Sequence, residues 1–235
     1  MSDLRVNISN FFKPEFVNSF PTYETFVSEL NEYIKMSQIF SSAVDELTTK
    51  LNIIDREFKL QYERNPIYNI RNRIKSPQSI FEKLERRGLP ISMQSARMNL
   101  TDIAGVRVIC HYIKDIYKIA DLLTFHEDIH LIKKSDYIAN PKPNGYRSLH
   151  IVINVPIYLE KGKEYVPLEV QIRTLAMDSW ASLEHQLRYK GNQEAKSIEY
   201  AQKLKECAEE IHHANLVMQD LYFSLYNAPE EDIEE

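Results

Sequence analysis

Residues 166–173 read Val-Pro-Leu-Glu-Val-Gln-Ile-Arg, and this stretch decides the fold because its apolar residues recur at every second position. The alternation predicts a strand with one apolar face over a core. The other face carries Glu169, Gln171 and Arg173. Because unpaired buried charges are costly, we expect this polar face to line a cleft. An edge strand with a solvated face is the alternative.

The rest of the chain supplies further strands and several helices around this strand. A hairpin turn over residues 159–163 joins residues 166–173 to the strand before them. We therefore expect one α/β domain with long helices at both ends of the chain. The remaining expected strands are 105–112, 129–134 and 149–155, and the expected helices are 22–64, 76–87, 116–125, 175–190 and 193–226.

Both long helices carry a heptad-like apolar stripe. In the C-terminal helix the stripe runs from Leu204 to Leu225 with alternating spacings of three and four residues. Either stripe could pack on its own domain or on a partner helix in an oligomer. The expected division of the chain is an N-terminal extension (1–21), a catalytic core with the first long helix (22–190), a C-terminal helix (191–228) and an acidic tail (229–235).

The composition excludes several classes of protein. The 29 basic and 34 acidic residues give a net charge of −5, which argues against a dedicated duplex-binding protein. Two cysteines rule out a disulfide scaffold and a four-thiolate zinc site. The sequence has no signal peptide and no run of 18 apolar residues, so we expect a cytoplasmic protein without membrane spans. The five glycines form neither common phosphate-binding loop, so any nucleotide phosphates must be held by side chains.

Polar residues at strand positions form the first candidate site. If the polar faces of the strands align, they bring together one set of side chains: Asp102, Arg107, His150, Glu169 and Gln171. Two carboxylates together favour Mg²⁺, which takes one or two carboxylates plus phosphate oxygens. For Asp102 alone, a turn residue at the entry of a strand is an equally good interpretation.

Two further stretches carry candidate binding residues. Basic and hydroxyl side chains at Arg73, Lys75, Ser79 and Lys83 surround an expected helix start, which is typical of a phosphate site without glycine. A solvated basic face is the alternative. Farther along, Tyr146 stands in a loop beside Lys142, where its ring could stack on a base or plug the end of the core.

The order of these motifs closely resembles the synthetase domain of RelA/SpoT-type enzymes. The motifs are Arg73-x-Lys75, Asp102-Ile-Ala-Gly-x-Arg107, Lys142-x-x-Gly-Tyr-Arg-Ser-Leu-His150, Glu169-Val-Gln-Ile-Arg173 and Trp180-Ala-Ser-Leu-Glu-His185. Chain length and flanking helices look like a small alarmone synthetase, most like the RelP-type branch. The resemblance implies a mixed five-stranded sheet of nucleotidyltransferase-like type, flanked by helices.

The resemblance also implies a reaction and a role for each matching residue. Such enzymes transfer the β,γ-pyrophosphoryl group of ATP to the 3′-hydroxyl of GTP or GDP and release AMP. Arg73 and Arg107 would sandwich the adenine, and Lys75, Ser79 and Lys83 would hold the ATP phosphates. Asp102 and Glu169 would bind Mg²⁺, and Glu169 would also activate the attacking hydroxyl. On the acceptor side, Tyr146 would stack on guanine, Lys142 and His150 would contact the phosphates, and Gln171 would support the site.

Several expectations about regulation and partners follow from the same resemblance. The chain lacks the His-Asp pair of the hydrolase domain found in larger relatives, so we expect synthesis without hydrolysis. The TGS-type and ACT-type regulatory regions of those relatives are not recognised in it either, so we expect no dependence on the ribosome. A homotetramer is expected from the small synthetases. Two alternatives stay open: a different metal-dependent nucleotidyltransferase, and a regulatory module that binds single-stranded RNA through its basic and aromatic residues.

Overall fold

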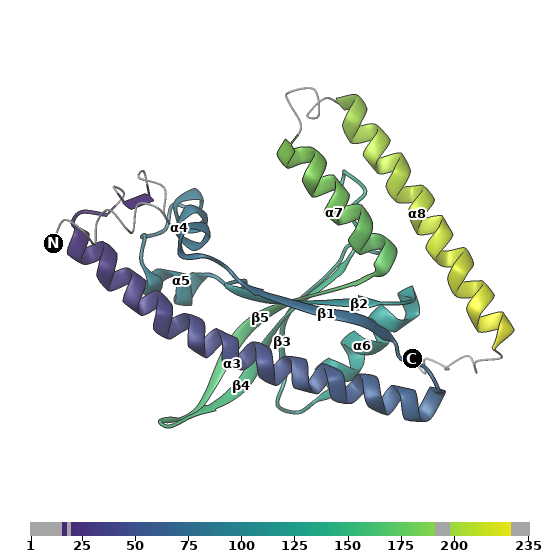
Figure 1. Cartoon of the computed structure of the whole chain (residues 1–235), viewed down its shortest axis with the longest axis horizontal. Helices are drawn as coiled ribbons and strands as arrows, with labels where there is room; N and C mark the ends of the chain where they lie inside the picture. The colour runs from purple at the N-terminus through teal and green to yellow at the C-terminus, as the bar shows by residue number, and fades with distance from the viewer. Residues whose placement is uncertain (1–15, 18–19, 191–197, 227–235) are drawn as a thin grey trace.

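A five-stranded mixed sheet forms the centre of the protein (Figure 1). The computed structural model describes residues 16–17, 20–190 and 198–226. The strand order is β1-β2-β5-β4-β3, in which β2 and β5 are parallel and the other neighbours are antiparallel. The expected mixed sheet of five strands is confirmed. Its strands are β1 (Ile67–Ile74), β2 (Ala104–Cys110), β3 (His130–Asp136), β4 (Leu149–Leu159) and β5 (Gly162–Thr174).

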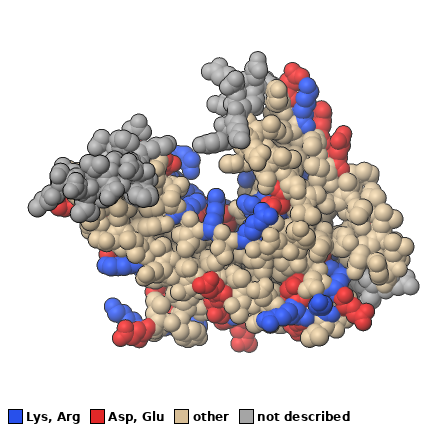
Figure 2. All heavy atoms as spheres, viewed as in Figure 1, with Lys and Arg blue, Asp and Glu red and all other residues tan. Residues whose placement is uncertain are grey.

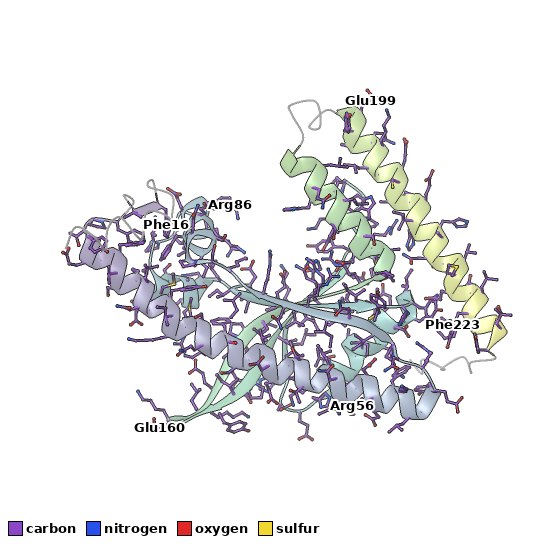
Figure 3. All side chains as sticks on the ribbon, in the orientation of Figure 1. Phe16, Arg56, Arg86, Glu160, Glu199 and Phe223 are labelled. Atoms are coloured by element: carbon purple, nitrogen blue, oxygen red, sulfur yellow. The ribbon has the colours of Figure 1, made fainter. Side chains whose placement is uncertain are left out.

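The β4–β5 hairpin is longer and its turn is tighter than expected. Leu159 pairs with Gly162, so only Glu160 and Lys161 form the turn instead of the five residues 159–163. Gly162 has a φ of +119°, a conformation that L side chains rarely adopt, and this allows the short connection. The long hairpin projects away from the sheet, with Glu160 at its tip (Figure 3).

Strand β1 is the strand that sequence periodicity did not reveal. Its isoleucines Ile67, Ile70 and Ile74 have helical spacing, yet the first two pair with Cys110 and Val108 of β2. A register shift between Ile67 and Asn69 places both isoleucines on the core side. The bulge therefore hides the alternation that identifies a strand.

One face of the sheet is covered by α3 (Tyr23–Tyr62) and α6 (Ile113–Phe125), as Figure 1 shows. Thr22 caps α3 by accepting a hydrogen bond from the backbone N–H of Thr25. Much of the expected α3 stripe is buried in the core, including Phe26, Leu47 and Leu51. Burying each such side chain stabilises the fold by about 1.5–3 kcal/mol. For α3, the interpretation as a helix packed on its own domain is confirmed.

Short helices and caps account for the remaining differences in boundaries. Ser76 caps α4 (Pro77–Arg86) as expected, whereas the seven-residue α5 (Met93–Asn99) was not predicted. Helix α6 begins three residues before the expected Ile116, because the Asp115 carboxylate accepts a hydrogen bond from the Tyr112 backbone N–H.

Helices α7 (Leu175–Lys190) and α8 (Ile198–Leu225) lie on the other side of the sheet. The C-terminal part of the α8 stripe does not pack on the domain: Met218, Leu221 and Leu225 are more than half exposed. Instead Ala208 and the polar Gln219 are buried, and Phe223 lies near the C-terminal end of the helix (Figure 3). Residues 191–197 and the expected acidic tail lie outside the described residues. None of the helices described is long and apolar enough for a bilayer crossing.

Candidate active site

The polar faces of the strands align into one surface on the side of the sheet opposite α3. Pairing places Arg71, Arg107, Gln171 and His150 side by side across β1, β2, β5 and β4. In the next row, Gly105 stands between Arg73 and Glu169, so no side chain separates them. Figure 2 shows the hollow above this surface, between α4 and α7, with Lys and Arg side chains along it. The expected cleft is present, but Arg173, at the end of the polar face of β5, is buried with only 2% exposed.

Asp102 joins two lysines at one end of the hollow. The residue lies two positions before β2, and its Oδ2 accepts hydrogen bonds from the ammonium groups of Lys75 and Lys83. A backbone hydrogen bond of 2.8 Å from Lys75 N–H to the Ile103 carbonyl holds the end of β1 beside Asp102. Burial raises the pKa of Asp102, but the two lysine hydrogen bonds outweigh it and leave the pKa below its ordinary value.

Glu169 belongs to a closed ring of hydrogen-bonded side chains. Its Oε1 lies 3.4 Å from His150 Nδ1, and its Oε2 accepts a 2.9 Å hydrogen bond from the Gln171 amide. His150 Nε2 lies 2.8 Å from the Tyr146 hydroxyl. Arg173 Nη2 closes the ring by donating to the Tyr146 hydroxyl at 3.0 Å and to Gln171 Oε1 at 2.6 Å. The ring fixes the orientation of all five side chains.

The charge state of Glu169 follows from this ring. The hydrogen bond with His150 holds the pKa of Glu169 below its ordinary value, although burial acts in the opposite direction. The charge of Asp102 also acts to raise this pKa, which shows that the two carboxylates lie within electrostatic reach of each other. Glu169 is therefore ionised at neutral pH and can act as a ligand or a proton acceptor.

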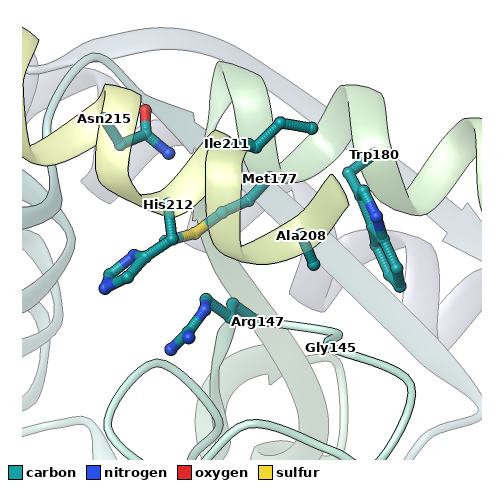
Figure 4. A pocket seen from close by; sticks show the side chains of 8 residues that line it. All are labelled: Gly145, Arg147, Met177, Trp180, Ala208, Ile211, His212 and Asn215. Atoms are coloured by element: carbon teal, nitrogen blue, oxygen red, sulfur yellow. The ribbon is translucent and has the colours of Figure 1, made fainter. Parts of the chain in front are cut away.

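The loop before β4 carries Lys142 and Tyr146. The Lys142 ammonium lies 4.5 Å from the ring centroid of Tyr137 and 4.8 Å from that of Tyr146. Gly145 N–H donates to the Lys142 carbonyl at 2.8 Å, and the φ of +88° at Gly145 makes this turn possible. The loop also packs against α8, where Arg147 Nη2 donates to Glu209 at 2.7 Å. Figure 4 shows a small pocket at this junction, formed by α7, α8 and the loop and separate from the polar surface.

The remaining predicted residues lie on the same side of the sheet. Arg73 and Arg107 are diagonal neighbours on the polar surface, because Arg73 pairs with Gly105. Ser79 lies exposed in the first turn of α4, and Lys83 follows one turn later on the same helix. The structure thus brings the predicted residues to one side of the sheet, in a group around Asp102 and a ring around Glu169.

Sequence reasoning gave no role to two residues that organise this surface. Alternation placed Arg173 on the polar face with Glu169 and Gln171, but not among the candidate site residues. Asp178, in α7, accepts hydrogen bonds from Arg107 at 3.1 Å, Arg173 at 3.4 Å and Arg71 at 3.5 Å. No local pattern could assign this role to Asp178, because its partners come from three different strands.

The donor set fits a hard divalent cation. Among the described residues, no group of three or more His, Cys, Asp and Glu side chains could hold a metal by itself. Asp102 Oδ1, however, is buried and has no hydrogen-bond partner in the described part of the chain, and the ionised Glu169 is within electrostatic reach of it. Two carboxylates without further protein ligands suit Mg²⁺, which usually completes its shell with water and phosphate oxygens.

Comparison with known proteins identifies one family. The region found in RelA/SpoT proteins matches residues 72–194. The GTP pyrophosphokinase YwaC of Bacillus subtilis is 46% identical over 175 residues, which cover 74% of this chain and 83% of YwaC. The B. subtilis GTP pyrophosphokinase YjbM is 37% identical over 151 residues, which cover 64% of this chain and 70% of YjbM.

Solved structures that resemble this chain belong to the same family. The small alarmone synthetase 2 from B. subtilis superimposes with a TM-score of 0.73 at 41% identity, covering 82% of this chain and 99% of that structure. The small alarmone synthetase 1 from B. subtilis, bound to its product pppGpp, also gives a TM-score of 0.73, at 30% identity, covering 83% of this chain and 98% of that structure.

Proposed function

The chain belongs to the small alarmone synthetases of the RelA/SpoT family, and from that premise we propose that it is a GTP pyrophosphokinase. The enzyme transfers the β,γ-pyrophosphoryl group of ATP to the 3′-hydroxyl of GTP or GDP, giving pppGpp or ppGpp and AMP. The observation that carries this proposal is the polar surface itself. A group of cations around Asp102 and a hydrogen-bonded ring around Glu169 meet on one side of the sheet. The two alternative functions are not favoured by the relatives.

The donor nucleotide is assigned to the Asp102 side. Arg73 and Arg107 would hold the adenine between them. Diagonal neighbours on a sheet face stand roughly 7–8 Å apart, a gap that suits a flat purine between two guanidinium planes. Lys75, Ser79 and Lys83 would hold the triphosphate at the N-terminal end of α4. Burial lowers the pKa of Lys75, although the nearby Asp102 carboxylate opposes this shift.

The acceptor nucleotide is assigned to the ring side. Tyr146 would stack on guanine after Lys142 swings from the ring face toward the acceptor phosphates. His150 would also contact these phosphates, and Gln171 would support the site. Glu169 takes the proton of the 3′-hydroxyl while the oxygen of that hydroxyl forms a bond to the β-phosphorus of ATP. The bond between the β-phosphorus and the oxygen bridging to the α-phosphorus breaks, and AMP leaves. Positioning and charge neutralisation by these side chains account for most of the catalysis.

Asp102 and Glu169 are the residues that would hold Mg²⁺. When bound, the ion neutralises phosphate oxygens of the nucleotides. The unpartnered Asp102 Oδ1 supports this assignment. The RelP-type branch, cytoplasmic location, synthesis without hydrolysis and independence from the ribosome stay predictions.

Product analysis tests the function directly. Incubation with ATP, Mg²⁺ and each of GTP, GDP and GMP, followed by ion-exchange chromatography, should give AMP and a 3′-pyrophosphorylated guanosine nucleotide in equal amounts. Release of inorganic pyrophosphate would indicate a different nucleotidyltransferase. Binding of single-stranded RNA without any nucleotide turnover would favour the regulatory module.

Tyr146→Ala is expected to raise the KM of the acceptor by about tenfold or more, because stacking on an aromatic ring contributes roughly 1–3 kcal/mol per base. The KM of ATP should change by less than threefold, since the cations around Asp102 lie on other elements. Initial rates with each nucleotide varied in turn measure both constants. Equal increases in the two constants would contradict the assignment of Tyr146 to the acceptor.

The exposed α8 stripe supports the proposed homotetramer. Met218 and Leu221 are 60% and 52% exposed, and single helices of monomeric proteins seldom present such a row. Light scattering after size exclusion should give the mass of four chains. Leu221→Glu should reduce that mass, whereas Leu60→Glu, at an 88% exposed position on α3, should not. A monomeric wild-type protein would contradict the tetramer.

A further inference from the structure

Asp178 is the common counter-ion of three arginines that come from three adjacent strands. Its Oδ1 accepts hydrogen bonds from Arg107 Nη1 at 3.1 Å and from Arg173 Nη1 at 3.4 Å, and its Oδ2 accepts one from Arg71 Nη1 at 3.5 Å. The Asp178 side chain is only 7% exposed. It projects from the first turn of α7 onto the polar surface, and within the described part of the chain no acid on a strand forms an ion pair with any of these three guanidinium groups.

Two of these arginines belong to the proposed binding sites of different nucleotides. Arg107 is assigned to the adenine of ATP. Arg173, whose side chain is 3% exposed, holds the Tyr146 hydroxyl at 3.0 Å and so fixes the ring assigned to guanine. Each guanidinium has a rigid, planar set of donors, so a bond at one edge orients the whole group. The carboxylate of Asp178 therefore fixes the plane of both groups at once.

We propose that Asp178 is a positioning residue that serves both purine subsites, by orienting Arg107 for the donor base and Arg173, with Tyr146, for the acceptor base. The proposal rests on the proposed function. It explains how Arg107 and Arg173 share a small region despite their like charges. It also keeps Arg173 from pairing directly with Glu169, because Arg173 takes its carboxylate partner from α7 and is linked to Glu169 only through other side chains of the ring.

Equilibrium binding of each nucleotide separately tests whether Asp178 supports both subsites. Asp178→Asn keeps the size of the side chain but removes its charge. Calorimetric titrations with ATP alone and with GDP alone should each show a Kd raised by about tenfold, the scale of a hydrogen bond to a charged group. Arg173→Lys keeps the charge but cannot hold Asp178, Gln171 and Tyr146 together. It should raise the Kd of GDP by a similar factor and change that of ATP by less than twofold.

The matched control is Glu164→Gln, which removes the acid partner of Arg97 in an ion pair outside the polar surface. It should leave both Kd values unchanged. If Asp178 has a merely structural role, Asp178→Asn lowers the melting temperature and leaves both affinities unchanged, and that result would overturn the proposal. A raised Kd for only one of the two nucleotides would overturn it as well. If Asp178→Asn does not fold, Arg173→Lys decides the question. The proposal is overturned if this variant raises the Kd of ATP, or if it leaves the Kd of GDP unchanged. Absence of turnover in the wild type would contradict the proposed function alone, because these affinities need no turnover.

Discussion

Glu169→Gln is expected to lower kcat by about 10²–10⁴-fold, the usual range for the loss of a general base. The amide keeps the shape of the side chain but cannot take the proton of the 3′-hydroxyl. His150 holds the pKa of Glu169 below its ordinary value, so the wild-type carboxylate is ionised throughout the neutral range. The hydrogen bonds around Asp102 do not include Glu169, so the Kd of ATP should change by less than about threefold.

Quantification of AMP formed at saturating nucleotides measures kcat, and equilibrium dialysis with ATP measures the affinity. Glu164→Gln, the same substitution outside the hollow, should retain wild-type kcat and so excludes a general effect of losing one acid. A decrease in kcat of less than tenfold would contradict the role of Glu169 as proton acceptor. In an RNA-binding module the same substitution would weaken nothing, because the loss of a negative charge favours binding to phosphates.

Strand β5 illustrates what the sequence could predict. Its period of two separated a buried face from a polar face, and this placed Glu169 and Gln171 on the surface where the structure shows them. Arg107 could be placed because β2 alternates in the same way, and Asp102 because it stands at the entry of that strand. Local spacing was sufficient wherever one strand or one helix turn determines the position of a side chain.

The features that escaped prediction depend on contacts between distant segments. Strand β1 was missed because a bulge gives its isoleucines helical spacing. The α8 stripe suggested a buried seam, yet the residues that contact the domain include Gln219, whose Oε1 accepts a hydrogen bond from Lys114 N–H at 2.9 Å. A polar residue buried by such a bond carries no hydrophobic signal. Asp178 was missed because its importance depends on arginines from three strands, which no local pattern reveals.

Asp102→Asn is expected to weaken both the folded state and the use of ATP, which distinguishes it from Glu169→Gln. Asp102 is the acid between Lys75 and Lys83, whose side chains are 17% and 16% exposed. A neutral amide leaves two neighbouring ammonium groups without their counter-ion, which should cost about 1–3 kcal/mol of unfolding free energy. The kcat/KM for ATP should fall by about 10²–10³-fold, because a predicted ligand of Mg²⁺ is lost and the lysines are no longer held for the phosphates.

The stability effect has a pH dependence whose sign follows from the pKa of Asp102. Burial raises this pKa, but the hydrogen bonds from Lys75 and Lys83 outweigh burial and hold it below its ordinary value. The ionised carboxylate therefore stabilises the fold fully above the ordinary aspartate pKa of about 3.9, and this contribution is lost as the pH falls through the lowered value. Denaturant unfolding of wild type and Asp102→Asn should give a large difference at pH 7 that shrinks in acid. A difference independent of pH would show that the substitution acts through packing, and that the charge of Asp102 does not hold the two lysines in place.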